Sequence, residues 1–145
     1  MSGTESTIAD KQAITELVLK YARGCDTQDP ELFKAIFAED GVIVSPHGMI
    51  DGRDKIVDVV PRMLGEMYLR CMHFVGNVLV DVQGDEATGE VYCFAHHLTK
   101  ESDDQASDFV MAIKYEDRFR RVDGRWQIAK RHLHLQWTET HSVKI

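Results

Sequence analysis

Two short segments of the chain carry residue types that together could remove a proton from a carbon atom. The first runs from Tyr21 to Asp26 and ends in a carboxylate, and the second, residues 72–77, contains the imidazole of His73. A carboxylate that orients an imidazole provides a general base without a metal or a cofactor. If one pocket holds both segments, we expect His73 to be the base, Asp26 to orient it, and Tyr21 to donate a hydrogen bond to a carbonyl or leaving oxygen.

Each of these residues also has a purely structural interpretation. Tyr21 lies on the apolar stripe of a predicted helix and could be a core aromatic residue with its hydroxyl at the rim. Asp26 could be an exposed turn carboxylate, although Asp29 already provides the N-cap of the next helix. His73 could simply bond to its neighbours. The functional interpretation therefore depends on whether the three side chains share a pocket.

Further polar side chains are candidates for binding a substrate. Alternation along the predicted strand 70–82 places Asn77 on the same face as His73. The last predicted strand carries Arg131, which is either a surface charge or an anchor for an anionic or halogen-bearing group. The candidates on later strands are His97, Tyr115 and Arg131.

The histidines allow one alternative, a metal site. It would combine His73, one residue of the pair His96 and His97, and the pair His132 and His134. The chain has no HxxxH motif on a predicted helix and no paired cysteines, so we expect no metal. The GxGxxG, GxxxxGK[ST] and GxSxG motifs are also absent, which disfavours nucleotide binding and serine-hydrolase chemistry. We therefore expect no cofactor.

Three helices are predicted in the first half of the chain. Apolar residues at helical spacing predict a helix over residues 7–23, ended by Gly24. A second helix is predicted over residues 29–38, because Asp, Pro and Glu in succession are typical of a helix start. A third is predicted over residues 52–64, kinked or shortened by Pro61.

Strands dominate the second half of the chain. A short hairpin is predicted at residues 42–45 and 49–50, and tight turns are predicted at residues 84–85 and 123–124. Helices followed by a meander of long antiparallel strands indicate an α+β fold. A long sheet that packs against helices on one face curls, and its concave side becomes a pocket. The four long strands are predicted at residues 70–82, 87–99, 107–121 and 125–138.

The bulk properties limit the class of protein. The 145 residues, 43% of them hydrophobic, suffice for one domain over residues 1–145 with a buried core. A net charge of -7 disfavours nucleic acid as a partner. No apolar run is long enough to cross a bilayer, and residues 1–10 do not resemble a signal peptide. Three cysteines without CxxC spacing indicate free thiols, so we expect a cytoplasmic protein without a membrane partner.

The chain resembles the SnoaL-like branch of the nuclear transport factor 2-like superfamily over residues 8–137. The resemblance lies in an opening segment, AITELVLKYARGCDTQDPELFKAIFAEDGV, and a closing segment, YEDRFRRVDGRWQIAKRH. It implies a cone-shaped α+β barrel, also called cystatin-like, with N-terminal helices packed on a strongly curved, mostly antiparallel sheet. These segments identify the fold well and the substrate poorly.

Two dehydratases of this superfamily are similar at the positions of the chemistry. In scytalone dehydratase an Asp after the first helix acts with a His in a His-Phe-Ile-Gly-Gly segment, which matches Asp26 and residues 73–77. Its second catalytic His falls at about His97. The bile acid 7α-dehydratases use a Tyr, an Asp five residues later and a His preceded by Met, which matches Tyr21, Asp26 and His73.

A third similar enzyme and two departures refine this resemblance. Hexachlorocyclohexane dehydrochlorinase uses an Asp–His dyad and an Arg on the last strand, which matches Asp26, His73 and Arg131. It also uses a basic residue one helix turn before the Asp, and Tyr21 occupies that position here. The second tyrosine of scytalone dehydratase falls near Ser45 and is missing. The base of ketosteroid isomerase falls near the same position, so isomerisation by that mechanism is disfavoured.

From the residues and the resemblance we expect a cofactor-independent lyase, most simply a dehydratase acting on a small cyclic or polycyclic hydrophobic substrate. Two alternatives remain open: a non-catalytic ligand-binding or assembly module of the same fold, and an isomerase or cyclase that uses the same base. The sheet surface left by an open meander predicts a homo-oligomer. The three similar enzymes imply a trimer, and dimers are common in the superfamily.

Overall fold

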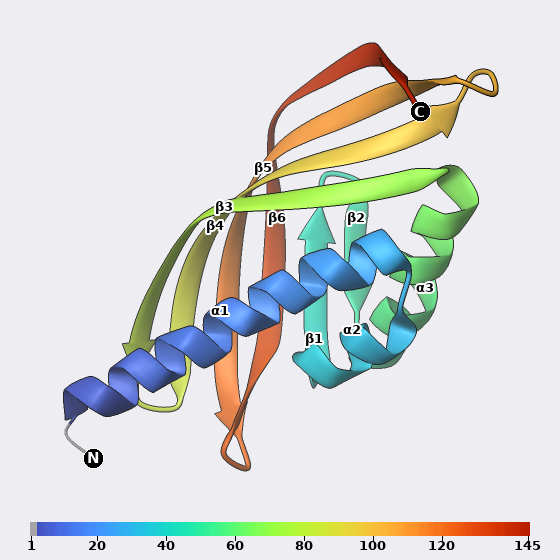
Figure 1. The fold of residues 1–145 in the computed structure, drawn as a ribbon. Coiled ribbons are helices and arrows are strands. Elements are labelled where there is room, and N and C mark those ends of the chain that lie inside the picture. Colours follow the sequence, from blue (N-terminus) through green and yellow to red (C-terminus); the bar gives the residue numbers. More distant parts are fainter. Residues whose placement is uncertain (1–2) are drawn as a thin grey trace.

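The computed structural model describes the backbone of residues 3–145 and the side chains of residues 7–145. A long helix, α1, runs diagonally across one face of a six-stranded sheet, and two shorter helices close one end of it (Figure 1). The elements in chain order are α1 (Gly3–Thr27), α2 (Pro30–Ile36), β1 (Phe37–Ser45), β2 (Gly48–Asp51), α3 (Arg53–Met67), β3 (Arg70–Gln83), β4 (Glu86–Lys100), β5 (Gln105–Val122) and β6 (Arg125–Lys144).

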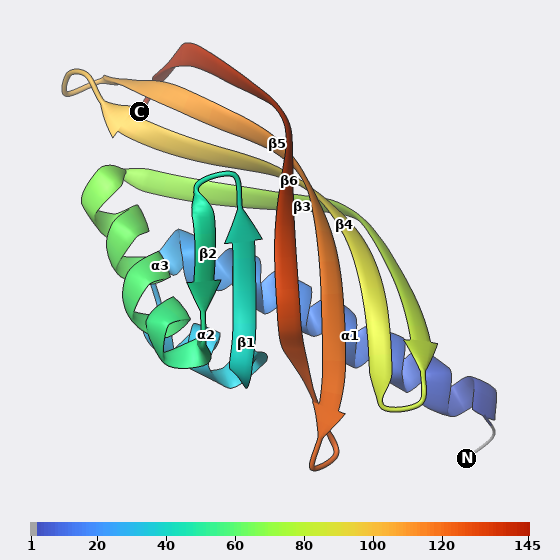
Figure 2. The same ribbon diagram turned by 180° about the vertical axis from the view of Figure 1, so that it is seen from behind.

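The sheet has the strand order β2-β1-β6-β5-β4-β3. All neighbouring strands are antiparallel except β1 and β6, which are parallel. Seen from behind, the strands bend strongly along their length and the helices lie on the far side of the sheet (Figure 2). This confirms the predicted α+β architecture of helices packed on a curved, mostly antiparallel sheet.

Apolar packing and two hydrogen bonds fix α1 on the sheet. Ile14 and Val18 are fully buried in one core cluster with Phe119 of β5. In the N-terminal half of the helix, Asp10 accepts hydrogen bonds from Arg121 Nη1 at 2.8 Å and Trp126 Nε1 at 2.9 Å. These contacts aim the C-terminal end of α1 at the concave side of the sheet. None of the described helices combines the length and apolarity needed to cross a bilayer.

The predicted helix ends needed correction. Gly24 does not end α1, which continues to Thr27. A Cβ at Gly24 would lie 3.0 Å from the Phe33 ring, so this glycine allows α2 to pack closely against α1. The predicted cap of α2 is confirmed, because the Asp29 carboxylate accepts a hydrogen bond from Glu31 N at 3.0 Å. The second helix ends at Ile36, earlier than predicted.

Two further predictions concern Pro61 and the tight turns. Pro61 is buried inside α3, and the helix continues to Met67, so Pro61 does not shorten it. Both predicted hairpin turns are confirmed, with positive φ angles at Gly84 (64°), Asp123 (51°) and Gly124 (74°). In the second turn the two consecutive residues with positive φ, Asp123 and Gly124, are what a type I′ hairpin turn requires. The four long strands all lie within a few residues of the predicted ranges except β6, which extends to Lys144.

Candidate active site

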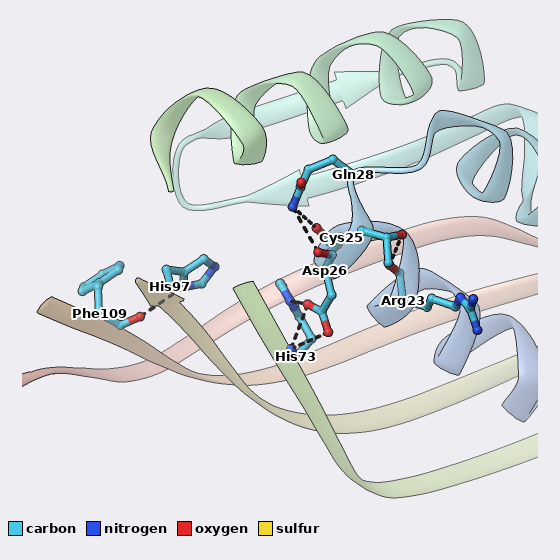
Figure 3. A network of polar contacts seen from close by, with 8 residues as sticks. Arg23, Cys25, Asp26, Gln28, His73, His97 and Phe109 are labelled. Carbon is cyan, nitrogen blue, oxygen red and sulfur yellow. Dashed lines mark hydrogen bonds and ion pairs between the residues drawn. The ribbon is translucent and has the colours of Figure 1, made fainter. Parts of the chain in front are cut away.

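The last turn of α1 and the start of β3 bring Asp26 and His73 into contact (Figure 3). His73 Nδ1 lies 2.7 Å from Asp26 Oδ1. The backbone N–H of His73 also donates to both oxygens of this carboxylate, at 3.0 and 3.1 Å. The side chain of His73 is 7% exposed and that of Asp26 is 26% exposed. The pair is therefore shielded on the imidazole side and partly open on the carboxylate side.

This geometry decides which nitrogen of His73 carries the proton. A carboxylate can only accept hydrogen bonds, so Nδ1 is the donor to Asp26. In the neutral ring Nε2 then has a free lone pair. The arrangement is that of an imidazole base whose tautomer is fixed by a carboxylate.

Gln28 supports Asp26 from the end of α1. Its side-chain Nε2 donates to the backbone oxygens of Cys25 and Asp26, both at 3.2 Å, and so caps two carbonyls that the helix leaves free (Figure 3). The backbone of Gln28 has a φ of 48°, a conformation uncommon outside glycine. Gln28 was not predicted as a site residue, because a Gln after a predicted helix carries no distinctive signal.

His97 on β4 presents a second imidazole to the same region. Its Nδ1 donates to the Phe109 carbonyl at 3.1 Å, which leaves Nε2 as an acceptor. Burial lowers the pKa of His97 below its usual 6.5, against a smaller opposing effect of the bond to Phe109. The His97 and His73 rings are 5.5 Å apart at 83°. The site therefore contains a second neutral imidazole with its acceptor nitrogen free.

A cavity of about 200 Å³ lies beside these imidazoles. Side chains from α1, α3 and all six strands line it, and most of them are apolar. The β1–β2 turn contributes Ser45 and His47, and the resemblance had placed functional side chains of related enzymes near this turn. His47 was not predicted. The predicted residues among the lining are Tyr21, His73, His97 and Tyr115.

The two tyrosines of the cavity are almost completely buried. Burial raises the pKa of Tyr21 well above its usual value, and the neighbouring Cys25 thiol raises it further. Burial likewise raises the pKa of Tyr115. Both hydroxyls therefore keep their protons at neutral pH. All three cysteines of the chain are free and buried.

Arg131 has neither of the two roles expected from the sequence, a surface charge or an anchor for an anionic group. It is 1% exposed and forms two bonds with the fully buried Asp117, Nε to Oδ1 at 2.9 Å and Nη2 to Oδ2 at 2.7 Å. Its guanidinium also lies over the rings of Tyr115 and Tyr21, at 3.9 and 4.3 Å. Arg131 is not among the residues that line the cavity. Asp117, its partner on the facing strand, was not predicted.

The prediction that Asn77 shares a face with His73 is wrong. The pairing of β3 with β4 shifts between Val75 and Val78, so a bulge occupies residues 76 and 77. The alternation of faces changes there, and Val78 instead of Asn77 packs toward the core. Asn77 is exposed and does not line the cavity.

The remaining histidines do not join the site. His132 and His134 flank the cavity-lining Leu133 and pair with Glu116 and Lys114 on the opposite face of the sheet. They are not among the residues that line the cavity with His73. Within the part of the chain that the structure describes, no three His, Cys, Asp or Glu side chains are grouped to hold a metal ion.

His96 forms a second carboxylate–imidazole pair outside the cavity. Its Nδ1 lies 2.7 Å from Asp108 Oδ2. His96 and His97 are successive residues of β4 and therefore point to opposite faces. The pair His96–Asp108 thus resembles His73–Asp26 in chemistry, but neither residue lines the cavity.

Comparison with known proteins defines the class. A model of the SnoaL-like domain family matches residues 6–132, and the chain belongs to this family. A relative from Mycobacterium tuberculosis, an uncharacterised protein, is 29% identical over 126 residues, which cover 86% of this chain and 84% of the relative. The family is therefore established for nearly the whole chain.

Solved structures agree with this assignment. A candidate scytalone dehydratase from Novosphingobium aromaticivorans has a TM-score of 0.82 at 27% identity, covering 94% of this chain and 90% of that protein. A hexachlorocyclohexane dehydrochlorinase has a TM-score of 0.86 at 19% identity, covering 96% and 93%. A nuclear transport factor 2-like superfamily protein from Salmonella enterica has the same fold. The predicted resemblance to this superfamily is confirmed.

Proposed function

We propose that this protein is a cofactor-independent lyase, a dehydratase that removes a proton from carbon in a small, hydrophobic, cyclic substrate. The observation that carries the proposal is the 2.7 Å contact between His73 Nδ1 and Asp26 Oδ1 at the edge of a mostly apolar cavity. A free Nε2 lone pair in such a cavity suits a general base.

A single imidazole can accept and return the proton in this elimination. His73 Nε2 takes the proton from carbon, and the electron pair of the C–H bond forms the new double bond as the carbon–oxygen bond breaks. The imidazolium then gives its proton to the departing hydroxyl, which leaves as water, and His73 returns to its neutral form. Asp26 stabilises the imidazolium between the two steps, as a hydrogen-bonded carboxylate does for other catalytic histidines.

The relatives and the cavity support this class of reaction and limit the substrate. The similar structure from Novosphingobium aromaticivorans is that of a candidate scytalone dehydratase, a dehydrating enzyme. The cavity of about 200 Å³ is smaller than the roughly 300–1,000 Å³ of pockets that hold drug-sized ligands. The buried ion pair with Asp117 neutralises Arg131, so the site favours a neutral substrate. We propose a compound with one or two rings.

We further infer that copies of this chain associate with one another. Strand pairing places Phe74, Phe94 and Trp137 in one row across the sheet, on the face opposite the cavity. All three side chains are exposed. Contiguous exposed aromatic side chains are typical of protein interfaces. A homo-oligomer, of which the trimer is the state expected from similar enzymes, would cover this row.

The test is a screen for turnover of cyclic alcohols and hydroxyketones, with loss of water followed by mass spectrometry. We expect His73→Ala to lower turnover of any active compound by about 10²–10⁴-fold. The matched control is His96→Ala, which removes an imidazole from the equivalent pair outside the cavity. Equal turnover in wild type and His73→Ala contradicts the mechanism. A product with the same mass as its substrate indicates an isomerase that uses the same base.

A further inference from the structure

The two imidazoles of the cavity, His73 and His97, have their protons fixed by different partners. Nδ1 of His73 donates to the Asp26 carboxylate at 2.7 Å, and Nδ1 of His97 donates to the Phe109 carbonyl at 3.1 Å (Figure 3). A carboxylate and a carbonyl can only accept hydrogen bonds, so both neutral rings carry their hydrogen on Nδ1. Each ring therefore keeps a bare lone pair on Nε2, and both residues line the cavity.

Nε2 of His97 is free and accessible. It has no hydrogen-bond partner among the side chains of residues 7–145. It is also not one of the enclosed atoms without a partner, which in that part of the chain are Arg53 Nε, Asp108 Oδ1 and His134 Nε2. Because His97 is only 4% exposed and lines the cavity, the open space that this nitrogen reaches is the cavity.

Aromatic neighbours hold the ring of His97 in place. The ring centroid of Tyr68 lies 4.7 Å from that of His97, and the ring centroid of Phe109 lies 6.1 Å from it. With the Nδ1 hydrogen bond to the Phe109 carbonyl, these contacts restrict the rotation of the imidazole. A group held in this way loses little further freedom when it binds a ligand. His97 is therefore a preorganised acceptor.

The charges of the two partners give the imidazoles different roles. The Asp26 carboxylate is negative and stabilises a protonated His73, whereas the Phe109 carbonyl that holds His97 is neutral. Burial also lowers the pKa of His97, and a charge on His73, whose ring centroid is 5.5 Å away, lowers it further. His97 therefore stays a neutral acceptor while His73 takes up the proton.

We propose that His97 Nε2 accepts a hydrogen bond from a hydroxyl group that the substrate retains, and so determines which carbon faces His73. The inference rests on the proposed function, in which His73 removes a proton from carbon. The departing hydroxyl does not suit His97, because an oxygen that donates to a neutral ring gains negative charge and leaves less readily. The substrate class is thereby narrowed to neutral cyclic compounds with at least two hydroxyl groups, one lost and one retained.

The test compares the binding of 2-naphthol, which has one hydroxyl, with that of 1,3- and 2,3-dihydroxynaphthalene, which have two. A single hydroxyl can use the acceptor of His73, so only the second one depends on His97. Binding is measured by titration calorimetry at neutral pH, where the hydroxyls keep their protons. We expect at least one of the diols to bind wild type about fivefold or more tightly than 2-naphthol does.

His97→Asn removes the proposed acceptor. Its side-chain amide can still donate to the Phe109 carbonyl, but no acceptor remains at the position of Nε2. We expect this variant to reduce the advantage of the diol to less than about twofold. His47→Asn is the matched control, because it makes the same substitution at an exposed imidazole of the cavity lining. We expect it to keep the advantage of the diol.

Three results overturn the proposal: no diol binds wild type more tightly than 2-naphthol, the advantage survives in His97→Asn, or it is lost in His47→Asn. If His97→Asn does not fold, nitrogen-15 spectra of wild type replace it. The His97 Nε2 resonance then moves with the diol and not with 2-naphthol, and an unmoved resonance refutes the inference. Because binding needs no turnover, a protein that shows the diol advantage and dehydrates nothing refutes the proposed dehydration alone.

Discussion

The Asp26 carboxylate holds His73 by its ring and by its backbone at once. Oδ1 lies 2.7 Å from the ring nitrogen Nδ1, and the backbone N–H of His73 lies 3.0 and 3.1 Å from the two oxygens. The end of α1 is thereby joined to β3 at the residue whose imidazole faces the cavity. One carboxylate therefore sets both the tautomer of the base and the position of the strand that carries it.

Replacement of Asp26 tests both roles. We expect Asp26→Asn to lower turnover of an active substrate by about 10²–10⁴-fold, because the imidazolium loses its carboxylate. We expect Asp26→Ala to lower the free energy of unfolding as well, by about 1–3 kcal/mol, because the His73 N–H loses its acceptor. Turnover assays and urea unfolding measure the two effects. Asp108→Asn is the control, and equal losses of turnover in the two Asn variants would show that the pairing is not catalytic.

The buried ion pair of Arg131 and Asp117 gives a prediction about stability. Asp117→Asn leaves the Arg131 charge without a counterion in the core, which we expect to cost about 3–5 kcal/mol of unfolding free energy. The double variant Arg131→Met, Asp117→Leu removes both charges, and we expect it to be more stable than Asp117→Asn. Urea unfolding of the three proteins is the measurement. A double variant less stable than Asp117→Asn is the result that contradicts this reasoning.

Local patterns predicted most of the fold from the sequence. The Asp29 cap and the turns at Gly84 and Gly124 depend on neighbouring residues only, and the structure contains all three. Gly24 was wrongly predicted to end the first helix, because its role depends on a residue of another helix. Its function is a close contact with Phe33, and the sequence does not show which ring will pack against a helix.

The candidate site was predictable where residue types and the family resemblance pointed to it, and not where it depends on how strands pair. Asp26 and His73 were recognised as a pair before the structure placed them together. Asn77 was misplaced because a bulge at residues 76 and 77 changes which side chains face inward; Gly76 was the one sign of it, since a glycine inside a strand often marks a bulge. Arg131 was misjudged because its partner Asp117 is fourteen residues away and becomes a neighbour only through the pairing of β5 with β6.

The lowered pKa of His97 predicts a pH dependence of stability. The folded protein binds a proton at His97 less readily than the unfolded chain, whose His has a pKa near 6.5. As the pH falls below about 6.5, the unfolded state takes up more protons and stability is lost. We expect the advantage of wild type over His97→Gln, which keeps a side-chain N–H but does not titrate, to decrease from pH 8 to pH 5. Urea unfolding across this range measures it, and a constant difference contradicts the prediction.

The outer aromatic row gives a prediction about self-association. Phe74, Phe94 and Trp137 are exposed on the face of the sheet opposite the helices, and Phe94 and Trp137 are in edge-to-face contact with ring centroids 6.1 Å apart. If this row is buried between copies of the chain, Trp137→Glu places a charge in the interface. We expect the variant to dissociate toward the monomer, with the mass measured by sedimentation equilibrium.

A second variant separates this effect from a general effect of added charge. Ile8 on α1 is also an exposed apolar residue, 64% accessible, but it lies away from the row. We expect Ile8→Glu to keep the oligomer of wild type. A wild-type monomer, or an unchanged mass in Trp137→Glu, contradicts the inferred interface. Because the row and the cavity lie on opposite faces of the sheet, we expect dissociated Trp137→Glu to keep the turnover that depends on His73.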